Sequence, residues 1–345
     1  CAYALSSQPG PAITELRKAI DLSGTDEYIE MEKTDSDFDN IRNNDRFQRL
    51  ISPTHHKTTT RFQLFHNNIL QMTSPVVLIT GCSSGIGKAL CWAFHAQGYQ
   101  VIATARRPET LTDLQTAGIT TLPLDVTNAN EIQQTIDTAL TQHQRLEILI
   151  NNAGYGQFGP LIDIPQQKLQ AQFQTNVFAP LAMVRQVAPI MKRQGAGIII
   201  NIGSISGIVT TPFAGAYCAS KAALHSLSDA LRLELAPFGI NVITVQPGAI
   251  QSNIGQATKK SLDGILTEDS WYLPFEQTIQ ERATLSQVGS TPTDEFAAQL
   301  VRQLSQPNPP AIIRLGNKSR WLPGLKKWLP TSWLEFLLKR RFGLQ

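Results

Sequence analysis

The chain has 345 residues, which is room for one large or two ordinary domains, and its 42% hydrophobic content is enough for a buried core. Its formal net charge of +3 is too small to favour a nucleic-acid partner. It contains no run of about 18 apolar residues, so we expect no membrane-spanning helix.

The four cysteines do not have the spacing of metal ligands, so no metal site is predicted. Two of them lie inside the functional motifs described below, where a disulfide would interfere, and no secretory signal is recognised. A reducing, cytoplasmic setting is therefore expected. The cysteines are Cys1, Cys82, Cys91 and Cys218.

Residues 1–71 differ from the rest of the chain. Asp, Glu, Asn, Thr and His dominate between residues 25 and 68, and Met72 stands shortly before the first predicted strand. We expect residues 1–71 to be a disordered extension or a translated upstream stretch. The alternative is a small accessory segment that packs on the core.

From Val76 onward, apolar strands alternate regularly with amphipathic helical stretches. This pattern predicts an α/β fold of the Rossmann type, a doubly wound parallel sheet with helices on both faces. Ligands of such sheets bind beyond the carboxyl ends of the strands. The predicted strands are 75–80, 100–105, 120–125, 147–151, 197–203, 241–246 and 311–315.

A glycine-rich turn follows the first predicted strand, with the sequence Thr80-Gly81-Cys82-Ser83-Ser84-Gly85-Ile86-Gly87. A helix that begins there presents unpaired N–H groups and the positive end of its dipole, which suits a phosphate. The spacing G-x-x-x-G-x-G differs from the common dinucleotide fingerprint G-x-G-x-x-G. Alone, the turn is a moderate signal, because such turns also occur without a ligand.

The second predicted strand ends in Arg106 and Arg107. A site that prefers NAD has Asp or Glu there to hold the ribose hydroxyls, whereas a guanidinium suits the 2′-phosphate of NADP. We therefore predict NADP(H), bound through Arg106. The alternative is that both arginines are solvated loop charges.

Tyr217 and Lys221 are four residues apart in a predicted helix, 216–237, so both lie on one face. A neighbouring ammonium is expected to lower the pKa of the phenol, which could then exchange a proton with an alcohol or carbonyl oxygen. Ser204 follows an apolar strand and could hold the same oxygen. On its own, a Y-x-x-x-K pair is more often a chance surface pair than a catalytic one.

Residues 249–292 break the alternation and carry few apolar runs, with Trp271, Tyr272, Leu273 and Phe275 clustered. A long irregular segment favours a functional role, and its apolar side chains indicate an apolar substrate. The family resemblance described below implies that it is the substrate loop and lid. Packing of these side chains within the loop is an equally good explanation.

Residues 317–345 are basic and rich in tryptophan, and their only acidic residue is Glu335. The basic residues are Lys318, Arg320, Lys326, Lys327, Lys339, Arg340 and Arg341. The stretch 333–341 reads as a short amphipathic helix, and tryptophan flanked by Lys and Arg is typical of an interfacial helix. A peripheral membrane contact is one interpretation. The other, slightly favoured, is that the apolar face packs over the substrate site or a partner subunit.

From about Pro75 to Gly316 the chain resembles the short-chain dehydrogenase/reductase family, in its group with the Y-x-x-x-K motif. Ser204 lies thirteen residues before Tyr217, an interval that suits the family. The matching motifs, in order, are Thr80 to Gly87, Asp125-Val126, Asn151-Asn152-Ala153-Gly154, Asn176, Ser204, Tyr217 with Lys221, and Pro247-Gly248.

The resemblance implies four catalytic residues. Tyr217 would be the general acid/base, and Lys221 would lower its pKa and hold the nicotinamide ribose. Ser204 would orient the carbonyl. Asn176 would hold a water in a proton relay through Lys221; a side chain bonded to nearby backbone is the alternative for this residue.

The resemblance also implies a set of cofactor contacts. Asp125 would meet the adenine amino group, and Ser252 would replace the threonine that commonly bonds the carboxamide after Pro-Gly. The full set is Gly81, Ser83, Ser84, Gly85, Ile86, Gly87, Arg106, Asp125, Val126, Asn152, Ala153, Gly154, Tyr217, Lys221, Pro247, Gly248, Ile250 and Ser252.

Together these features predict an NADP(H)-dependent oxidoreductase, spanning 72–316, that acts on a lipophilic carbonyl/alcohol pair. The pattern is similar to 17β-hydroxysteroid dehydrogenase, retinol dehydrogenase and acyl-dihydroxyacetone-phosphate reductase-like members, and implies a homo-oligomer, a dimer or tetramer. If the protein were instead an NAD-dependent alcohol dehydrogenase, Arg106 would have no part in binding the cofactor. A non-catalytic nucleotide-binding regulator and a membrane-docked scaffold are the alternatives outside catalysis.

Overall fold

The computed structural model describes residues 74–251, 261–306 and 308–345. The chain divides into two units, Cys1–Gln71 and Met72–Gln345, and all described residues belong to the second. The predictions for residues 1–71 and for Ser252 therefore lie outside the described residues. Among the helices of the described part, none is long and apolar enough to cross a membrane.

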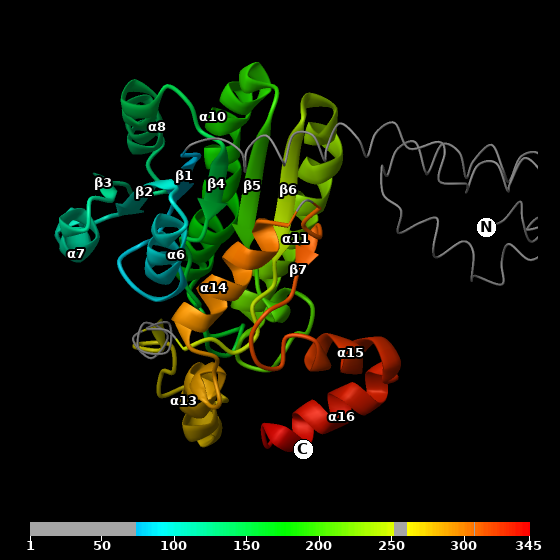
Figure 1. Ribbon diagram of the computed structural model, residues 1–345. Coiled ribbons are helices and arrows are strands. Elements are labelled where there is room, and N and C mark those ends of the chain that lie inside the picture. Colours follow the sequence, from blue (N-terminus) through cyan, green and yellow to red (C-terminus); the bar gives the residue numbers. More distant parts are fainter. Residues whose placement is uncertain (1–73, 252–260, 307) are drawn as a thin grey trace, which may run out of the picture. The chain divides into compact units, whose positions relative to one another are not determined.

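Seven parallel strands form one sheet in the order β3-β2-β1-β4-β5-β6-β7 (Figure 1). The strands are β1 (Val76–Ile79), β2 (Gln100–Ala105), β3 (Thr120–Pro123), β4 (Ile148–Asn151), β5 (Gly197–Ile202), β6 (Ile240–Val245) and β7 (Ile312–Ile313). The predicted doubly wound fold is confirmed. The last strand is shorter than the predicted 311–315, at an edge where it pairs only with β6.

The central strands are apolar throughout because helices cover both sides of the sheet. β1, β4 and β5 are buried along their whole length. A continuous apolar run, rather than an alternating one, is what a parallel strand buried on both faces requires. Leu78 of β1 is opposite Leu149 of β4, which is opposite Ile199 of β5, so this register aligns apolar side chains across the sheet.

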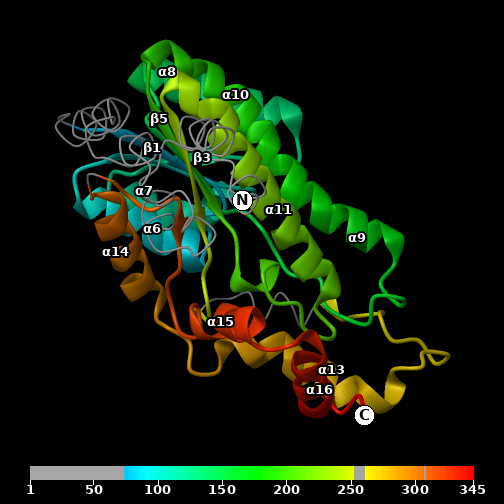
Figure 2. The ribbon, with the colours of Figure 1, turned by 90° about the vertical axis from the view of Figure 1, so that its right-hand side faces the viewer.

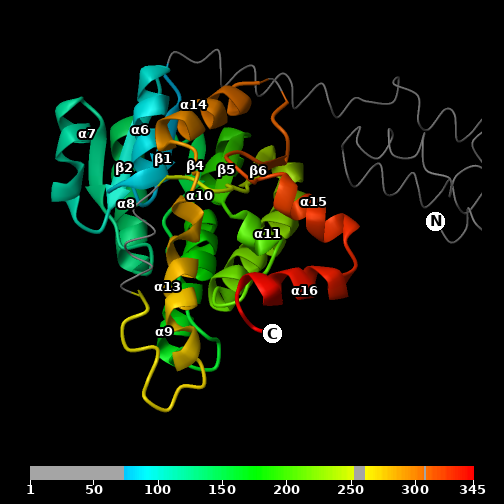
Figure 3. The ribbon, with the colours of Figure 1, turned by 90° about the horizontal axis from the view of Figure 1, so that it is seen from below.

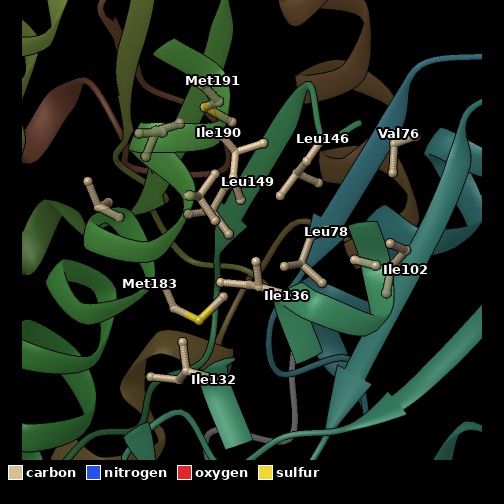
Figure 4. Packing of buried hydrophobic residues seen from close by; sticks show 14 of the residues in the cluster. Val76, Leu78, Ile102, Ile132, Ile136, Leu146, Leu149, Met183, Ile190 and Met191 are labelled. Atoms are coloured by element: carbon tan, nitrogen blue, oxygen red, sulfur yellow. The ribbon is translucent and has the colours of Figure 1, made fainter. Parts of the chain in front are cut away.

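Two helix layers flank the sheet (Figure 2). One layer contains α6 (Gly85–Ala96) and α14 (Thr293–Leu304), which pack on each other. The other contains α8 (Ala129–His143), α10 (Ala179–Gln194) and α11 (Gly215–Leu235). In the core under α8 and α10, Ile136 and Met183 meet Leu78 and Leu149 of the strands (Figure 4).

Short helical elements interrupt or end two of the longer helices. η4 (Gln174–Phe178) is a π-helical turn between α9 (Gln166–Phe173) and α10, a feature that often marks functional sites. α11 ends two residues before Pro237, because proline lacks the N–H that continues a helix. Pro237 itself lies in the following turn, η6 (Ala236–Phe238). The remaining elements are η3 (Pro108–Leu111), α7 (Thr112–Thr116), η5 (Ile205–Gly207), η7 (Leu273–Phe275), α13 (Glu276–Thr284), η8 (Leu285–Gln287), α15 (Trp321–Trp328) and α16 (Thr331–Arg341).

The end of the basic tail packs on the segment that follows β6 (Figure 3). Buried Phe342, just after α16, meets Phe213 and Ile279, with Tyr272 and Phe275 packed against them. Within the predicted stretch 333–341, Leu338 also packs against this cluster, whereas Trp333, Phe336 and Leu337 are exposed, so both interpretations of the tail stay predictions. The clustered aromatic residues Tyr272 and Phe275 pack within their own segment.

Candidate active site

The glycine turn between β1 and α6 has the geometry of a phosphate cradle. Gly81 adopts φ 72°, and a Cβ on Gly87 would lie 2.4 Å from both the Gly81 carbonyl oxygen and Asn152 Nδ2. Only glycine fits a backbone that approaches itself so closely. Ser84, at the start of α6, forms no capping hydrogen bond with its side chain, so the first N–H groups of the helix are available to an anion.

The turn is fastened to the end of β4. Asn152 Nδ2 donates to the carbonyl oxygens of Thr80 (2.8 Å) and Gly81 (3.0 Å), and the backbone N–H groups of Asn152 and Ala153 donate to Thr80 Oγ1. This brings the predicted Gly81–Gly87 and Asn152–Gly154 groups together at the switch between β1 and β4, where the strand order reverses. The residues present therefore fit a dinucleotide.

Arg106 and Asp125 follow the next two strands of the sheet. Arg106 is exposed directly after β2 and, within the described part of the chain, forms no ion pair. Burial opposes ionisation of Asp125, but hydrogen bonds from Thr127 and the charge of Arg106 leave the pKa of this carboxyl below its usual value. Val126 is buried beside it.

Ser204, Tyr217 and Lys221 meet beyond the carboxyl end of β5. Ser204 directly follows the strand, and its side chain hydrogen-bonds that of Tyr217. Tyr217 and Lys221 lie one turn apart on α11, and Lys221 Nζ is 6.0 Å from the centre of the tyrosine ring. Lys221 Nζ also donates to the Ile202 carbonyl oxygen at 2.7 Å. Three of the four predicted catalytic residues thus lie together on two neighbouring elements.

The expectation of a lowered tyrosine pKa is wrong for the protein alone. Burial raises the pKa of Tyr217, and the hydrogen bond with Ser204 and the charge of Arg282 only partly offset this. Burial also lowers the pKa of Lys221 to about 8, because desolvation disfavours its charge. Desolvation therefore affects the pKa values of Tyr217 and Lys221 more than the attraction between a phenolate and an ammonium does.

Asn176 lies in the π-helical turn η4 and its side chain is fully engaged. Its Oδ1 accepts from Tyr155 N at 3.1 Å, and its Nδ2 donates to Tyr155 O (2.8 Å) and Ser220 Oγ (3.1 Å). This clip holds the chain after Gly154 against α11; a Cβ on Gly154 would lie 3.7 Å from Lys221 Nζ. The side chain bonds backbone, as in the alternative interpretation, and the proposed water position remains a prediction.

Pro247, Gly248 and Ile250 follow β6. The Pro247 carbonyl oxygen accepts from Ile205 N at 3.1 Å, next to Ser204, and Gly248 N donates to Leu315 O at 2.9 Å. A Cβ on Gly248 would lie 2.0 Å from Asn317 O, so this position requires glycine. Ile250 is buried and bridges to Thr291.

The Phe158 ring stacks on Tyr217, with centroids 5.8 Å apart. Two further residues at the site were not given a role from the sequence. His225 Nε2 accepts from Ser204 N at 3.3 Å, and Arg282 of α13 reaches the site from the loop segment. The motif around Tyr217 includes His225, but no spacing rule links it to Ser204. Arg282 lies 61 positions after Lys221, within the segment 249–292 that breaks the alternation, so no sequence pattern indicates it.

Acid is expected to destabilise the protein through His225. Burial and the charge of Lys221 lower its pKa to about 4 in the folded protein, against about 6.5 in an unfolded chain. The unfolded state binds the additional proton between these values, so the free energy of unfolding should fall as the pH drops from about 6.5 to 4. Denaturant titrations at pH 7 and 4.5 should show a smaller fall in His225→Gln than in the unsubstituted protein; equal falls would contradict this assignment.

A family model described as short chain dehydrogenase matches residues 75–263. A short-chain dehydrogenase, ptmH, of Penicillium ochrochloron is 39% identical over 223 residues, covering 64% of this chain and 80% of that protein. A 3-ketodihydrosphingosine reductase of Bacteroides thetaiotaomicron is 32% identical over 276 residues, covering 79% of this chain and 100% of that protein.

Solved structures agree in fold. A short-chain dehydrogenase from Streptomyces avermitilis superposes with a TM-score of 0.66 and 31% identity, covering 78% of this chain and 97% of that chain. A serine dehydrogenase in complex with NADP+ gives a TM-score of 0.62 and 25% identity, covering 71% of this chain and 96% of that chain.

Proposed function

The chain belongs to the short-chain dehydrogenase/reductase family and is an oxidoreductase, and from this premise we propose that it reduces a lipophilic ketone with NADPH. The observation that carries the proposal is the meeting of Ser204, Tyr217 and Lys221 beyond the carboxyl end of β5. This is the edge of the sheet at which the glycine cradle follows β1, two strands away. Bound NADPH would supply the hydride. The reverse reaction, oxidation of the alcohol, uses the same groups.

Each protein group has a definite task in this proposal. Ser204 Oγ holds the substrate carbonyl oxygen, and the Tyr217 hydroxyl donates a proton to that oxygen as negative charge develops on it. Lys221 holds the ribose hydroxyls and stabilises the phenolate that remains. Asn176 holds the chain after Gly154 against α11, close to Lys221, and a water bound there would return the proton.

Turnover tests this function directly. The full chain should oxidise NADPH when mixed with members of a panel of medium-chain ketones, steroids, retinal and acyl-dihydroxyacetone phosphate, followed by absorbance. Binding of NADPH without turnover of any member would favour the non-catalytic nucleotide-binding alternative.

The choice of NADP(H) over NAD(H) rests on Arg106. An exposed guanidinium with no ion-pair partner among the described residues, at the end of β2, suits a 2′-phosphate. The solved serine dehydrogenase complex with NADP+ is a structural neighbour consistent with this choice.

Arg106→Ala should raise KM for NADPH by about 10- to 100-fold, because a charge-assisted hydrogen bond contributes about 1.5–3 kcal/mol. KM for NADH should change little, since NADH lacks the 2′-phosphate. Arg107→Ala is the matched control, and steady-state kinetics with both cofactors give the measurement. Loss of binding for both cofactors would mean that Arg106 has a structural role instead.

The lipophilic substrate is supported by the apolar surroundings of Tyr217. Phe158 stacks on its ring, and the cluster of Phe213, Ile279 and Phe342 closes over the same end of the sheet. The related 3-ketodihydrosphingosine reductase bears a name that denotes a lipid ketone.

A membrane contact through α15 and α16 would bring the site to such substrates. Trp321 and Trp328 are 64% and 80% exposed and seven residues apart, hence on one face of α15, and Trp333 of α16 is 63% exposed. All seven basic side chains of residues 317–345 are exposed as well. Aromatic rings with surrounding cations suit an anionic lipid surface.

Replacing Trp321, Trp328 and Trp333 by serine should weaken binding to phosphatidylserine vesicles at least tenfold in a sedimentation assay. The matched control is Trp271→Ser, which removes an 81% exposed tryptophan outside the tail. Absence of vesicle binding by the unsubstituted protein at low salt would exclude this contact.

A further inference from the structure

Arg282 is a buried cation beside the proposed proton donor. It lies on α13 with 8% of its surface exposed, and its Nε and Nη2 both donate to Thr211 Oγ1, at 3.0 and 2.8 Å. Its Cζ lies 5.0 Å from the centre of the Phe158 ring, and that ring stacks on Tyr217. One aromatic ring thus links the guanidinium to the reactive tyrosine.

No anion balances this charge among the described residues. The ion pairs found there join Lys88 to Asp113, Arg145 to Glu147 and Arg232 to Asp229. The stretch 252–260, outside the described part, contains no Asp or Glu in its sequence. The titratable groups that Arg282 interacts with are Tyr217 and Cys218, and burial raises the pKa of both, so that both are neutral near pH 7.

A buried arginine without a counter-ion is unusual, because its desolvation costs several kcal/mol unless an anion compensates. Burial lowers the pKa of the guanidinium, but the group stays charged because arginine does not deprotonate in proteins. It has five N–H donors, and a single hydroxyl accepts two of them. Most of its N–H donors therefore remain available to a ligand at the edge of the reaction site.

The surroundings would strengthen a contact with an anion. Ile279 is one turn before Arg282 on α13 and packs with Phe213 and Phe342, while Phe158 covers the guanidinium from another element. Electrostatic attraction is stronger in such an apolar environment than in water. The planar fork of an arginine matches the oxygens of a carboxylate or a phosphate.

We propose that Arg282 binds an anionic oxygen group, a carboxylate or a phosphate, that the substrate carries close to its reacting carbonyl. This inference rests on the proposed reductase function and assigns its substrate class: a ketone that is apolar at one end and anionic near the carbonyl. Ammonium-bearing ketones are disfavoured by the same charge.

The test compares substrates that differ only in this charge. One pair is a 3-oxo fatty acid and its methyl ester; the other is acyl-dihydroxyacetone phosphate and its dephosphorylated form. For the full chain, kcat/KM should be about 10- to 100-fold higher for the anionic member of at least one pair, and the pair that responds identifies carboxylate or phosphate.

Arg282→Met keeps an unbranched side chain against Phe158 and should bring this ratio close to one, mainly through KM for the anionic member. Arg282→Lys should restore part of the preference because it retains the charge. Arg302→Met removes an exposed arginine of α14 and should leave the ratio as it is. These ratios do not depend on the fraction of each variant that folds.

Several results would overturn the proposal. Equal losses for both members of a pair in Arg282→Met, with a shifted pH profile, would mean that Arg282 acts on Tyr217 instead. A preference of the unsubstituted protein for the neutral members would also refute it. If no ketone turns over, the proposed function itself fails, and calorimetric binding of each pair to the protein with NADP+ then decides on Arg282: equal affinities refute the anion site.

Discussion

Tyr217→Phe should lower kcat by a factor of about 10²–10⁴, the usual contribution of a positioned general acid. The substitution removes only the hydroxyl, which hydrogen-bonds Ser204 and, in the proposed reaction, donates the proton to the carbonyl oxygen. The ring remains to stack on Phe158. Cofactor affinity, measured by fluorescence titration with NADPH, should therefore change little.

Tyr99→Phe is the matched control, because it also removes one hydroxyl from a largely buried tyrosine, at a position that precedes β2 and is bonded to Ser305. It should retain turnover. If Tyr217→Phe kept more than a tenth of the original kcat, Tyr217 would not be the proton donor, and another group would have to supply the proton.

Lys221→Met should lower kcat/KM by about 10²–10³ and yet not destabilise the protein at pH 7. The ammonium is 6% exposed and has no carboxylate partner among the described residues, and burial lowers its pKa to about 8. Below pH 8 the folded protein therefore carries a desolvated charge whose cost is about 3 kcal/mol, from about 1.4 kcal/mol per pH unit. Methionine removes that cost but leaves the Ile202 carbonyl oxygen without its donor, which offsets part of the gain.

The pH dependence of folding stability tests this explanation of the Lys221 charge. Between pH 8 and about 10.5 the Lys221 side chain binds more protons in the unfolded state than in the folded one, so the unsubstituted protein should gain stability relative to Lys221→Met as the pH rises through this range. Lys221→Met should lack that gain, and denaturant titrations at pH 7, 8.5 and 9.5 would show it. A variant that is much less stable at every pH would mean that Lys221 mainly supports the fold.

Two buried cations near Tyr217 connect stability with function. Lys221 and Arg282 are both buried cations without carboxylate partners in the described residues, and both adjoin Tyr217. A buried charge that lowers the stability of the free protein is expected where a bound ligand interacts with that charge. For Lys221 and Arg282, the cofactor and the substrate of the proposed reaction would be these ligands.

The sequence by itself determined the fold and the order of the motifs. Apolar runs such as 76–79 and 198–200 fit strands buried on both faces, and their alternation with amphipathic helices favours the parallel sheet that the structure contains. Gly81, Tyr217 and Lys221 could be singled out because their roles depend on local geometry, a turn or one face of a helix, which spacing along the chain reports.

Tertiary structure alone decided what depends on burial and on contacts between distant segments. The pKa of Tyr217 moves upward, contrary to the prediction from its neighbour Lys221, because desolvation is set by the whole surroundings and not by spacing. Arg282 reaches Thr211 and Phe158 only because α13 folds back over the ends of the strands. The sequence of an irregular segment such as 249–292 has no periodicity that specifies where it will pack, so the residue on which we base the substrate class became visible only in the folded chain.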